Sequence, residues 1–562
     1  MTKAKLFTGI YDLQTSPFAF DFMTFLAICD AHRLDQGCEG LNVLIIPGKG
    51  TGFECADFEK YHEAQFPIEH AQWRFMNVFM PALGLVPNLH GLTICTSRDH
   101  GREIMKDLDG PIFPEGYDIE DPPEVYWTDF EASMLGNLGL EYPGFRAPPE
   151  ALGFIDRWIE QNAGGRKVVS MTLREGLHGS VKNSNTEAWV EFARSLDPDK
   201  YYPVFIPDMV RSFDGERTDL GGFPVFSDPT SNIMIRMALY ERCYVSMFTS
   251  CGPISICFYN GAVRYLIFKT SPPYHKGKLP WAVVMGLDPA NNNIRVATPY
   301  QKRFAEEETF ERLTEEFKKM EERIEADPED AFRRHKLQRT DIGPGSVSEV
   351  VNYLSLDSQS FHAADYCHRF LDRYPDQLDS MIDILAKTEM TVSHGNPDSY
   401  QRSYEIYDAW TKSGKPVSKY IAWATMKAAA VLGDKEQLDQ LMKIAPQIDE
   451  ELNEDGSLQA GLLQIAVIYF KRGEGEEALE VAHIADKSHR TPSTLNLIGM
   501  ILEGMGRFEE ARDVFMELVD NGVESPLIFE SLSRIHQALG ETELHIEYMH
   551  KAVGSGQPAG AG

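Results

Sequence analysis

The stretch YVSMFTSCGPISICFYNGAVRYLIFK, residues 244–269, contains the most informative pattern in the chain. Its two ends, 244–248 and 264–268, are runs of apolar and aromatic residues with the length of buried β-strands. Between them, a Ser-Cys-Gly-Pro turn at 250–253 opens a short helical segment at 254–259. The order strand, turn, helix, strand predicts one unit of a parallel sheet with helices packed on it.

The same alternation of strands and helices extends over the first 300 residues. A proline-rich stretch, Pro143–Pro149, interrupts it, and a connecting helix at 150–162 follows. We therefore predict two Rossmann-like halves with parallel sheets, residues 1–148 and residues 149–326. The expected strands are 6–13, 41–47, 92–96, 167–173, 202–207, 244–248 and 264–268, and the expected helices are 18–33, 72–83, 186–196, 233–242 and 254–259.

Strand patterns disappear in the last third of the chain, and a repeat takes their place. Ala478, Ala511 and His545 occupy equivalent positions 33 and 34 residues apart, within similar patterns of small and large apolar residues. The pattern resembles the tetratricopeptide repeat, which implies an α-solenoid of stacked helix pairs over residues 346–553. The fold class expected for the whole chain is thus α/β followed by all-α.

Three segments around the repeat have simpler interpretations. Residues 306–326 predict a charged helix that is mostly solvated. Residues 327–345 predict a linker, because the Asp-Ile-Gly-Pro-Gly run at 341–345 breaks regular structure. Residues 554–562, rich in glycine, predict a disordered tail.

The balance of charges is strongly acidic, with 54 Lys and Arg against 85 Asp and Glu, a formal net charge of −31. A field of this sign repels nucleic acids and anionic membranes, so we expect neither as a partner. No stretch approaches the roughly 18–20 apolar residues of a membrane span. Eight cysteines without a Cys-x-x-Cys pair indicate buried thiols in a reducing compartment, so we expect a cytoplasmic protein.

The segment 244–269 also resembles a known family. It is similar to the second half of bacterial-type glycosyltransferases of the GT-B fold, particularly heptosyltransferase-like and fucosyltransferase-like enzymes. In those enzymes a strand ends in a Gly-Pro or Gly-Ser turn that holds the diphosphate of the nucleotide-sugar donor. The resemblance implies that this chain contacts the donor through a similar turn, at Ser250, Cys251, Gly252 and Pro253. The alternative, an ordinary tight turn between strand and helix, remains open.

Further donor contacts follow from the same resemblance. Arg174 occupies the place of an arginine that grips the diphosphate, and a guanidinium suits this task because it can bond two oxygens at once. Lys182 and Asn185 precede the next helix, and Asp208 closes the next strand. The fucosyltransferase-like pattern has a histidine where Thr172 stands, which leaves the subfamily open. A surface ion pair for Arg174 and a loop cap for Asp208 are the structural alternatives.

An inverting transferase needs a group that takes the proton of the acceptor hydroxyl. Asp12 is the first candidate because it follows the first strand, and Asp99 and His100 follow the third. Structural roles for all three are the alternative. We predict no metal site and no cofactor: the Asp-x-Asp runs at 107–109 and 197–199 look like exposed turns, and histidines and cysteines lack zinc spacing.

These observations predict a metal-independent glycosyltransferase whose nucleotide-sugar donor binds residues 149–326. A protein or glycan acceptor is expected to enter from the first half. The repeats are expected to bind the acceptor or another protein, or to mediate self-association. Two alternatives remain: a non-catalytic repeat scaffold with a degenerate glycosyltransferase-like domain, and a different enzyme on the same fold, such as a sugar-nucleotide epimerase.

Overall fold

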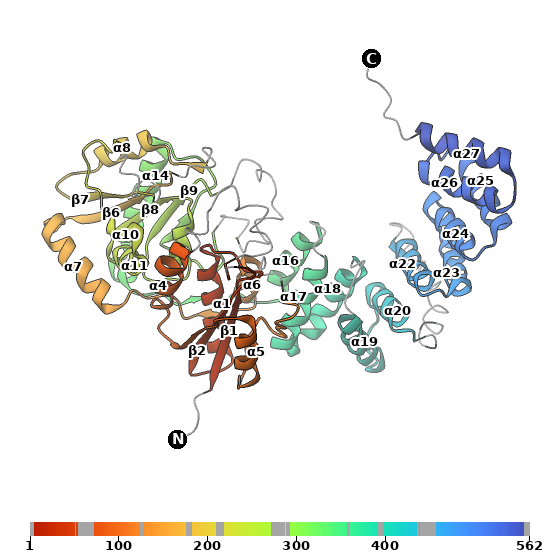
Figure 1. Ribbon diagram of the computed structural model, residues 1–562, viewed down its shortest axis with the longest axis horizontal. Helices are drawn as coiled ribbons and strands as arrows, with labels where there is room; N and C mark the ends of the chain where they lie inside the picture. The colour runs from red at the N-terminus through yellow and green to blue at the C-terminus, as the bar shows by residue number, and fades with distance from the viewer. Residues whose placement is uncertain are drawn as a thin grey trace, which may run out of the picture. The chain divides into compact units, whose positions relative to one another are not determined.

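The chain folds into two compact units, Met1–Tyr353 and Leu354–Gly562. The first is α/β and the second is entirely helical where it is described, so the fold class expected from the sequence is confirmed (Figure 1). The structure is a computed structural model, and it describes residues 5–50, 52–53, 72–123, 128–175, 182–208, 219–270, 287, 293–356, 360–391, 397–434, 436, 438 and 457–555.

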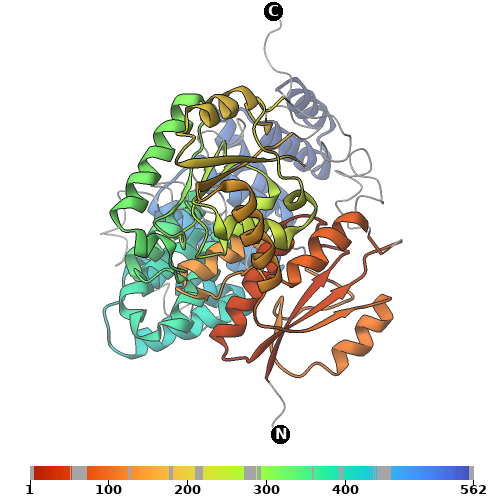
Figure 2. The same ribbon diagram turned by 90° about the vertical axis from the view of Figure 1, so that its left-hand side faces the viewer.

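The first half of the α/β unit contains a four-stranded parallel sheet in the order β3-β2-β1-β4. Its strands fan out side by side in Figure 2, at the lower right. The strands are β1 Leu6–Asp12, β2 Gly40–Ile46, β3 Leu89–Ile94 and β4 Ile112–Phe113. The helices are α1 Asp21–Asp35, the π-helical turn η1 Phe75–Phe79, α4 Met80–Leu83, α5 Arg98–Lys106 and α6 Thr128–Asn137.

Helix α1 lies tightly on strand β1. Tyr11 of β1 is fully buried, and its ring makes edge-to-face contacts with those of Phe22 and Phe25, with centroids 4.8 and 4.9 Å apart. Gly9 permits this approach, because a Cβ atom there would stand 2.6 Å from the Cys29 sulfur. Phe22, Phe25 and Cys29 therefore lie on the face of this helix that covers the sheet.

The second half contains a five-stranded sheet in the order β10-β9-β8-β6-β7, again with every pair parallel. The predicted unit at residues 244–269 is confirmed as β8, two short helical turns and β9. The strands are β6 Lys167–Thr172, β7 Tyr201–Ile206, β8 Val245–Thr249, β9 Tyr265–Phe268 and β10 Gln301–Arg303. The helices are α7 Pro149–Ala163, α8 Thr186–Ser195, α10 Asp228–Ser231, α11 Ile233–Arg242, η3 Gly252–Ile254, α12 Ser255–Phe258 and α14 Phe310–Ala326.

The segment predicted to be a linker, 327–345, contains regular structure. It holds α15, Pro328–Phe332, and β11, Leu337–Gln338. Strand β11 pairs antiparallel with β5, Glu141–Tyr142, so the chain returns from the second half to the end of the first. The predicted break is also wrong in part, because Pro344 and Gly345 already belong to the first turn of a helix, α16 Pro344–Leu356. Pairing with a strand about two hundred residues away is invisible in local sequence.

The second unit consists of stacked helices, and the predicted repeat is confirmed in its last three pairs. Ala478 and Ala511 are completely buried, and a Cβ atom on Gly499 would stand 2.8 Å from the Phe515 ring. Small residues therefore stand where helices touch, as the repeat requires. The helices are α16 Pro344–Leu356, which crosses the boundary of the two units, α17 Ser360–Arg373, α18 Leu378–Thr391, α19 Pro397–Lys412, α20 Lys419–Leu432, α22 Ser457–Lys471, α23 Gly475–Ser488, α24 Pro492–Gly504, α25 Phe508–Asp520, α26 Pro526–Ala538 and α27 Thr542–Ser555. Of the predicted tail, residues 556–562 lie outside the described residues.

A buried polar network lies among helices α17 to α20. Glu389 is 4% exposed, and its carboxylate meets His368 at 3.0 Å and accepts a hydrogen bond from Tyr407 at 2.6 Å. Lys427 donates to the backbone carbonyl of Glu389 at 2.8 Å. Burial lowers the pKa of Lys427 to about 8, against the opposing effect of the Glu389 charge. The protonated lysine is therefore costly in the folded state.

This shift predicts a pH-dependent stability of the helical unit. The unfolded chain holds the Lys427 proton up to a pKa near 10.5, but the folded chain releases it near 8, so stability from this group rises with pH between these values. Relative to Lys427→Met, the wild type should gain about 2–3 kcal/mol of unfolding free energy from pH 8 to 10.5. Urea unfolding across this range measures the difference, and Lys412→Met, on the exposed side of α19, is the control. A constant difference across the range would contradict the assignment.

Candidate functional site

The second sheet reverses its strand order between β6 and β8. Strand β6 pairs with β7 on one side and with β8 on the other, and the register places Thr172 beside Phe248 near the two carboxyl ends. Ligands of open α/β sheets bind outside the carboxyl ends of the strands at such a reversal. The predicted donor residues Arg174 and Ser250 follow these two strands directly. The topology therefore brings together two segments that are 76 residues apart.

The Arg174 side chain bridges the strand reversal. Its Nη1 donates to the Ser250 carbonyl at 3.0 Å, and its backbone N–H donates to the Ser184 hydroxyl at 2.8 Å. The Ser184 hydroxyl lies 2.6 Å from that of Thr249, the last residue of β8. A guanidinium has five N–H donors, and the bond to Ser250 uses one of them. Arg174 is thus held in place at the reversal with further donors for an anion.

The turn at 250–253 has a packing role as well. A Cβ atom on Gly252 would stand 2.4 Å from the ring of Phe20, a residue of the first half, so glycine permits a close contact between the halves. The Ser250 N–H donates to the backbone carbonyl of Phe268 within the sheet, and Pro253 has no N–H. Burial raises the pKa of the Cys251 thiol to about 11, so this thiol is protonated at neutral pH. Among the described residues, the backbone donors of this turn still without a partner are those of Cys251 and Gly252.

Asp208 and Asn185 support the loops around Arg174. Asp208 accepts the backbone N–H of Glu175 at 3.0 Å, which ties the loop after β7 to the loop after β6. Asn185 caps α8, since its side chain accepts the Ala188 N–H at 3.3 Å. Lys182 is half-buried just before this cap. These contacts show what positions the predicted residues, and their contact with a donor stays a prediction.

Glu308 belongs to the same cluster and was missed by sequence reasoning. It is 1% exposed, and its Oε1 accepts the Asn185 N–H at 2.9 Å and the Thr249 hydroxyl at 3.2 Å. Burial raises the pKa of this carboxyl group. It stands in a run of glutamates, 306–308, whose pattern indicated a solvated helix. The helix starts later, at Phe310, and the preceding loop turns Glu308 inward.

In the first half, Asp12 is buried in a polar cluster with Arg98 and Tyr117. Its two oxygens accept hydrogen bonds from Arg98 at 2.8 and 2.9 Å, and one also accepts the Tyr117 hydroxyl at 2.6 Å. The Asp12 side chain is 1% exposed, and Arg98 donates further to the Ile119 carbonyl at 2.5 Å. Burial and the Asp12 carboxylate raise the pKa of Tyr117. Because both of its oxygens are engaged by donors of its own half, Asp12 is placed to hold the loops rather than to take a proton.

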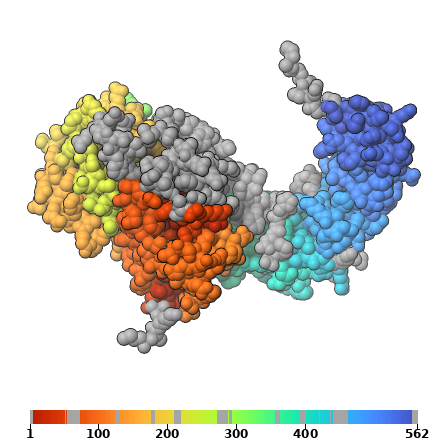
Figure 3. Space-filling view, in the orientation of Figure 1, coloured from red at the N-terminus to blue at the C-terminus, as the bar shows by residue number. Residues whose placement is uncertain are grey.

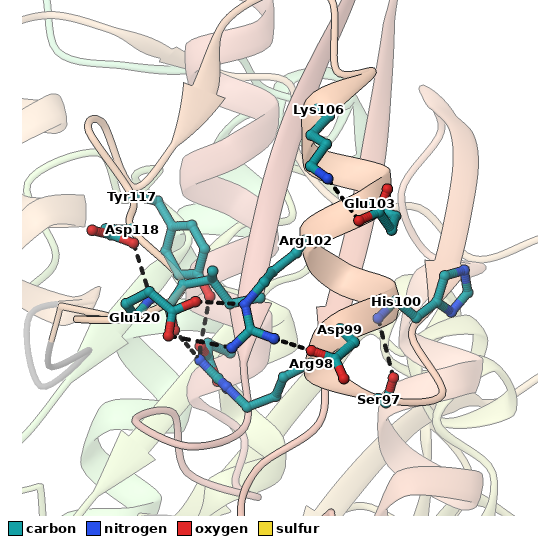
Figure 4. Close-up of polar contacts among 12 residues, drawn as sticks. Ser97, Arg98, Asp99, His100, Arg102, Glu103, Lys106, Tyr117, Asp118 and Glu120 are labelled. Carbon is teal, nitrogen blue, oxygen red and sulfur yellow. Dashed lines mark hydrogen bonds and ion pairs between the residues drawn. The ribbon is translucent and has the colours of Figure 1, made fainter.

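The other two base candidates lie on the first turn of α5, at the same end of the sheet (Figure 4). The Asp99 side chain is 89% exposed and pairs with Arg102. His100 accepts the Thr96 N–H on its Nδ1 at 3.2 Å and is half-exposed. Of the three candidates, these two retain contact with solvent.

The described residues contain no group of three His, Cys, Asp or Glu side chains that could hold a metal ion. Across the same part of the chain, no helix combines the length and apolarity needed to cross a membrane.

Comparison with solved structures finds two kinds of likeness. A glycosyl transferase family 9 structure from Veillonella parvula DSM 2008 is 11% identical, with a TM-score of 0.32, and the match covers 48% of this chain and 82% of that one. A tetratricopeptide repeat protein from Parabacteroides merdae ATCC 43184 is 12% identical, with a TM-score of 0.26. The match covers 38% of this chain and 80% of that one. A thermophilic TPR protein of Thermus thermophilus is 16% identical, with a TM-score of 0.24. The match covers 38% of this chain and 100% of that one. No protein-family model and no curated protein matches the chain.

Proposed function

We propose that the α/β unit is a glycosyltransferase that takes a sugar from a nucleotide-sugar donor without a metal ion. The observation that carries the proposal is the Arg174 guanidinium, which bonds the Ser250 carbonyl where the second sheet reverses its strand order, while Ser184 holds the Arg174 backbone. Ligands of open α/β sheets occupy this place. A guanidinium there supplies two parallel hydrogen bonds to a diphosphate.

The chemistry follows from charge development in the reaction. As the sugar leaves, negative charge grows on the nucleoside diphosphate, and Arg174 with the N–H groups of Cys251 and Gly252 neutralises it. The acceptor hydroxyl loses a proton in the same step. His100 and Asp99 are the proposed bases, since Asp12 is fully engaged by Arg98 and Tyr117.

The helical unit would bind a protein, either the acceptor or a recruiting partner, because stacked helix pairs present an extended concave surface. A cytoplasmic site of action fits the acidic charge and the free buried cysteines.

A thermal-shift panel tests the donor site. Full-length protein is heated with UDP, GDP, ADP, CMP and their sugar conjugates, and one nucleotide class should raise the melting temperature. Binding at about 100 times Kd adds roughly 2.7 kcal/mol to the stability of the folded state. Arg174→Ala should abolish the shift because it removes the charge at the strand reversal.

Arg242→Ala is the matched control, since this arginine pairs with Asp156 on the surface. It should leave the shift unchanged. If no nucleotide shifts well-folded wild-type protein, the glycosyltransferase proposal fails and the repeat scaffold becomes the better interpretation. A nucleotide shift without sugar release to any acceptor would favour a degenerate domain that only binds.

A further inference from the structure

The carboxylate of Glu308 ends a chain of hydrogen bonds that begins at Arg174. The Arg174 N–H donates to the Ser184 hydroxyl at 2.8 Å, and that hydroxyl lies 2.6 Å from the Thr249 hydroxyl. Thr249 in turn donates to Glu308 Oε1 at 3.2 Å. Because the Thr249 proton goes to the carboxylate, the Ser184 hydroxyl is the donor in its own bond with Thr249. Every proton of the chain therefore points toward Glu308.

The guanidinium of Arg174 depends on the same carboxylate by a second route. Its Nη1 donates to the carbonyl of Ser250, the residue that directly follows Thr249. The loop before α8 is held as well, since Glu308 Oε1 accepts the Asn185 N–H at 2.9 Å. The Asn185 side chain also donates to the Glu308 carbonyl at 3.3 Å. Both the backbone and the guanidinium of Arg174 are thus held by segments that Glu308 fixes.

A strained lysine braces this loop from the end of β9. Among the described residues, Lys269 is the one non-glycine residue with a positive φ, +58°. Strain of this kind persists only where the surroundings determine it strongly, and it clusters at functional sites. The Lys269 ammonium donates to the Asn183 carbonyl at 3.0 Å and pairs with Glu307 at 2.9 Å. The loop at 183–185 is therefore fixed from the ends of several strands at once.

Packing alone does not explain a carboxylate at position 308. Glu308 is 1% exposed, and within the described part of the chain its Oε2 has no hydrogen-bond partner. Burial raises the pKa of the group, so its charged form is costly in the folded state. A glutamine has the same shape, and its carbonyl oxygen would accept the bonds from Asn185 and Thr249 without a charge. An incompletely satisfied buried group that lowers stability in this way is typical of functional sites.

The turn that Arg174 bonds lies where the two halves of the α/β unit meet. The ring of Phe20, from the first half, stands against Gly252 of this turn. The orange surface of the first half adjoins the yellow surface of the second in Figure 3. Whatever holds the turn therefore also sets the donor site against the half expected to bind the acceptor.

We propose that Glu308 is a positioning residue, which holds Arg174 and the turn after β8 in the arrangement that binds the diphosphate of the donor. It acts through the hydrogen-bond chain and does not touch the ligand. The inference rests on the proposed donor site. Hydrogen bonds to an ionised acceptor are stronger than neutral ones, and bonds in a chain polarise one another, so the charge tightens the chain as far as Arg174.

Calorimetric titration of the full chain with UDP, GDP and ADP in turn, together with thermal unfolding of the same proteins, tests this role. Glu308→Gln should weaken the diphosphate that binds the wild type by roughly three- to tenfold, because each bond to the acceptor loses its charge. The melting temperature of the α/β unit should stay equal or rise, because a buried charge is removed. A purely structural carboxylate would give the opposite pattern, with lower stability and unchanged affinity.

Glu316→Gln is the matched control. Glu316 is a buried carboxylate of α14 that pairs with Arg312 at 3.2 Å and with Lys319 at 3.0 Å. Its substitution removes a charge that has partners, so the melting temperature should fall slightly. Its affinity for the diphosphate should equal that of the wild type.

Thr249→Val interrupts the chain in its middle and leaves the Glu308 charge in place. It should weaken the diphosphate as Glu308→Gln does, and Thr249→Ser, which keeps the hydroxyl, should bind more tightly than Thr249→Val. If Glu308→Gln unfolds, this pair of variants decides, since equal affinities of the two would overturn the proposal.

Two other results would overturn it and separate it from the donor site. Wild-type affinity in Glu308→Gln, or tighter binding through loss of its repulsion of the diphosphate, combined with loss of binding in Arg174→Met, would remove the role of Glu308 and leave the donor site intact. Absence of binding of any diphosphate by the wild type would overturn the donor site itself, and the positioning role with it.

Discussion

Replacing Asp12 with alanine should lower the unfolding free energy of the α/β unit by about 3 kcal/mol. The variant leaves the Arg98 guanidinium and the Tyr117 hydroxyl without the carboxylate that accepts both. Arg98 is mostly buried, with a side chain 20% exposed, so water replaces the lost partner only in part. The loss is measured by urea denaturation of the full chain, in which the unfolding transition of the α/β unit is monitored.

Asp99→Ala is a matched control from the same sheet edge. Its side chain is 89% exposed in its pair with Arg102, and such a pair contributes roughly 0–1 kcal/mol. Asp12→Asn separates structure from catalysis, because it keeps the shape but exchanges an acceptor for a donor facing Arg98. If Asp12→Asn folds with wild-type stability and loses only sugar transfer, Asp12 is the catalytic base and our structural assignment is wrong.

Gly261→Ala should destabilise the same unit by about 3 kcal/mol through overpacking. The new Cβ atom would stand 2.0 Å from the backbone carbonyl oxygen of His335, and no side-chain rotation can relieve a clash with a backbone atom. The His335 N–H also donates to the Gly261 carbonyl at 2.9 Å, so the two segments cannot separate without losing a hydrogen bond. A fall in the melting temperature of the full chain measures the effect.

Gly345→Ala provides the comparison. It stands in the first turn of α16, and a Cβ atom there meets nothing within 4 Å. Alanine should be neutral there or stabilise the helix by roughly 0.5–1 kcal/mol, since it reduces the freedom of the unfolded chain. Similar melting temperatures for the two variants would show that the crossing of His335 over Gly261 is not close-packed in solution.

The candidate site was only partly predictable. Ser250 was found because its turn follows a strand, and parallel strands place their carboxyl ends at one edge, whereas Arg174 was found through the resemblance to GT-B glycosyltransferases. Glu308 was missed because a run of three glutamates looks like a solvated surface, and its burial depends on where a loop turns.

The sequence by itself determined the class of each part. Apolar runs alternating with helical patterns specify parallel sheets with helices on them, and a 33- to 34-residue spacing of small residues specifies stacked helix pairs, because both patterns reflect contacts with near neighbours in the chain. Only the tertiary structure decided the strand order, the return of residues 337–338 to the strand at 141–142, and the engagement of Asp12 by Arg98. These depend on pairing between residues tens to hundreds of positions apart, which leaves no periodic trace in a single chain.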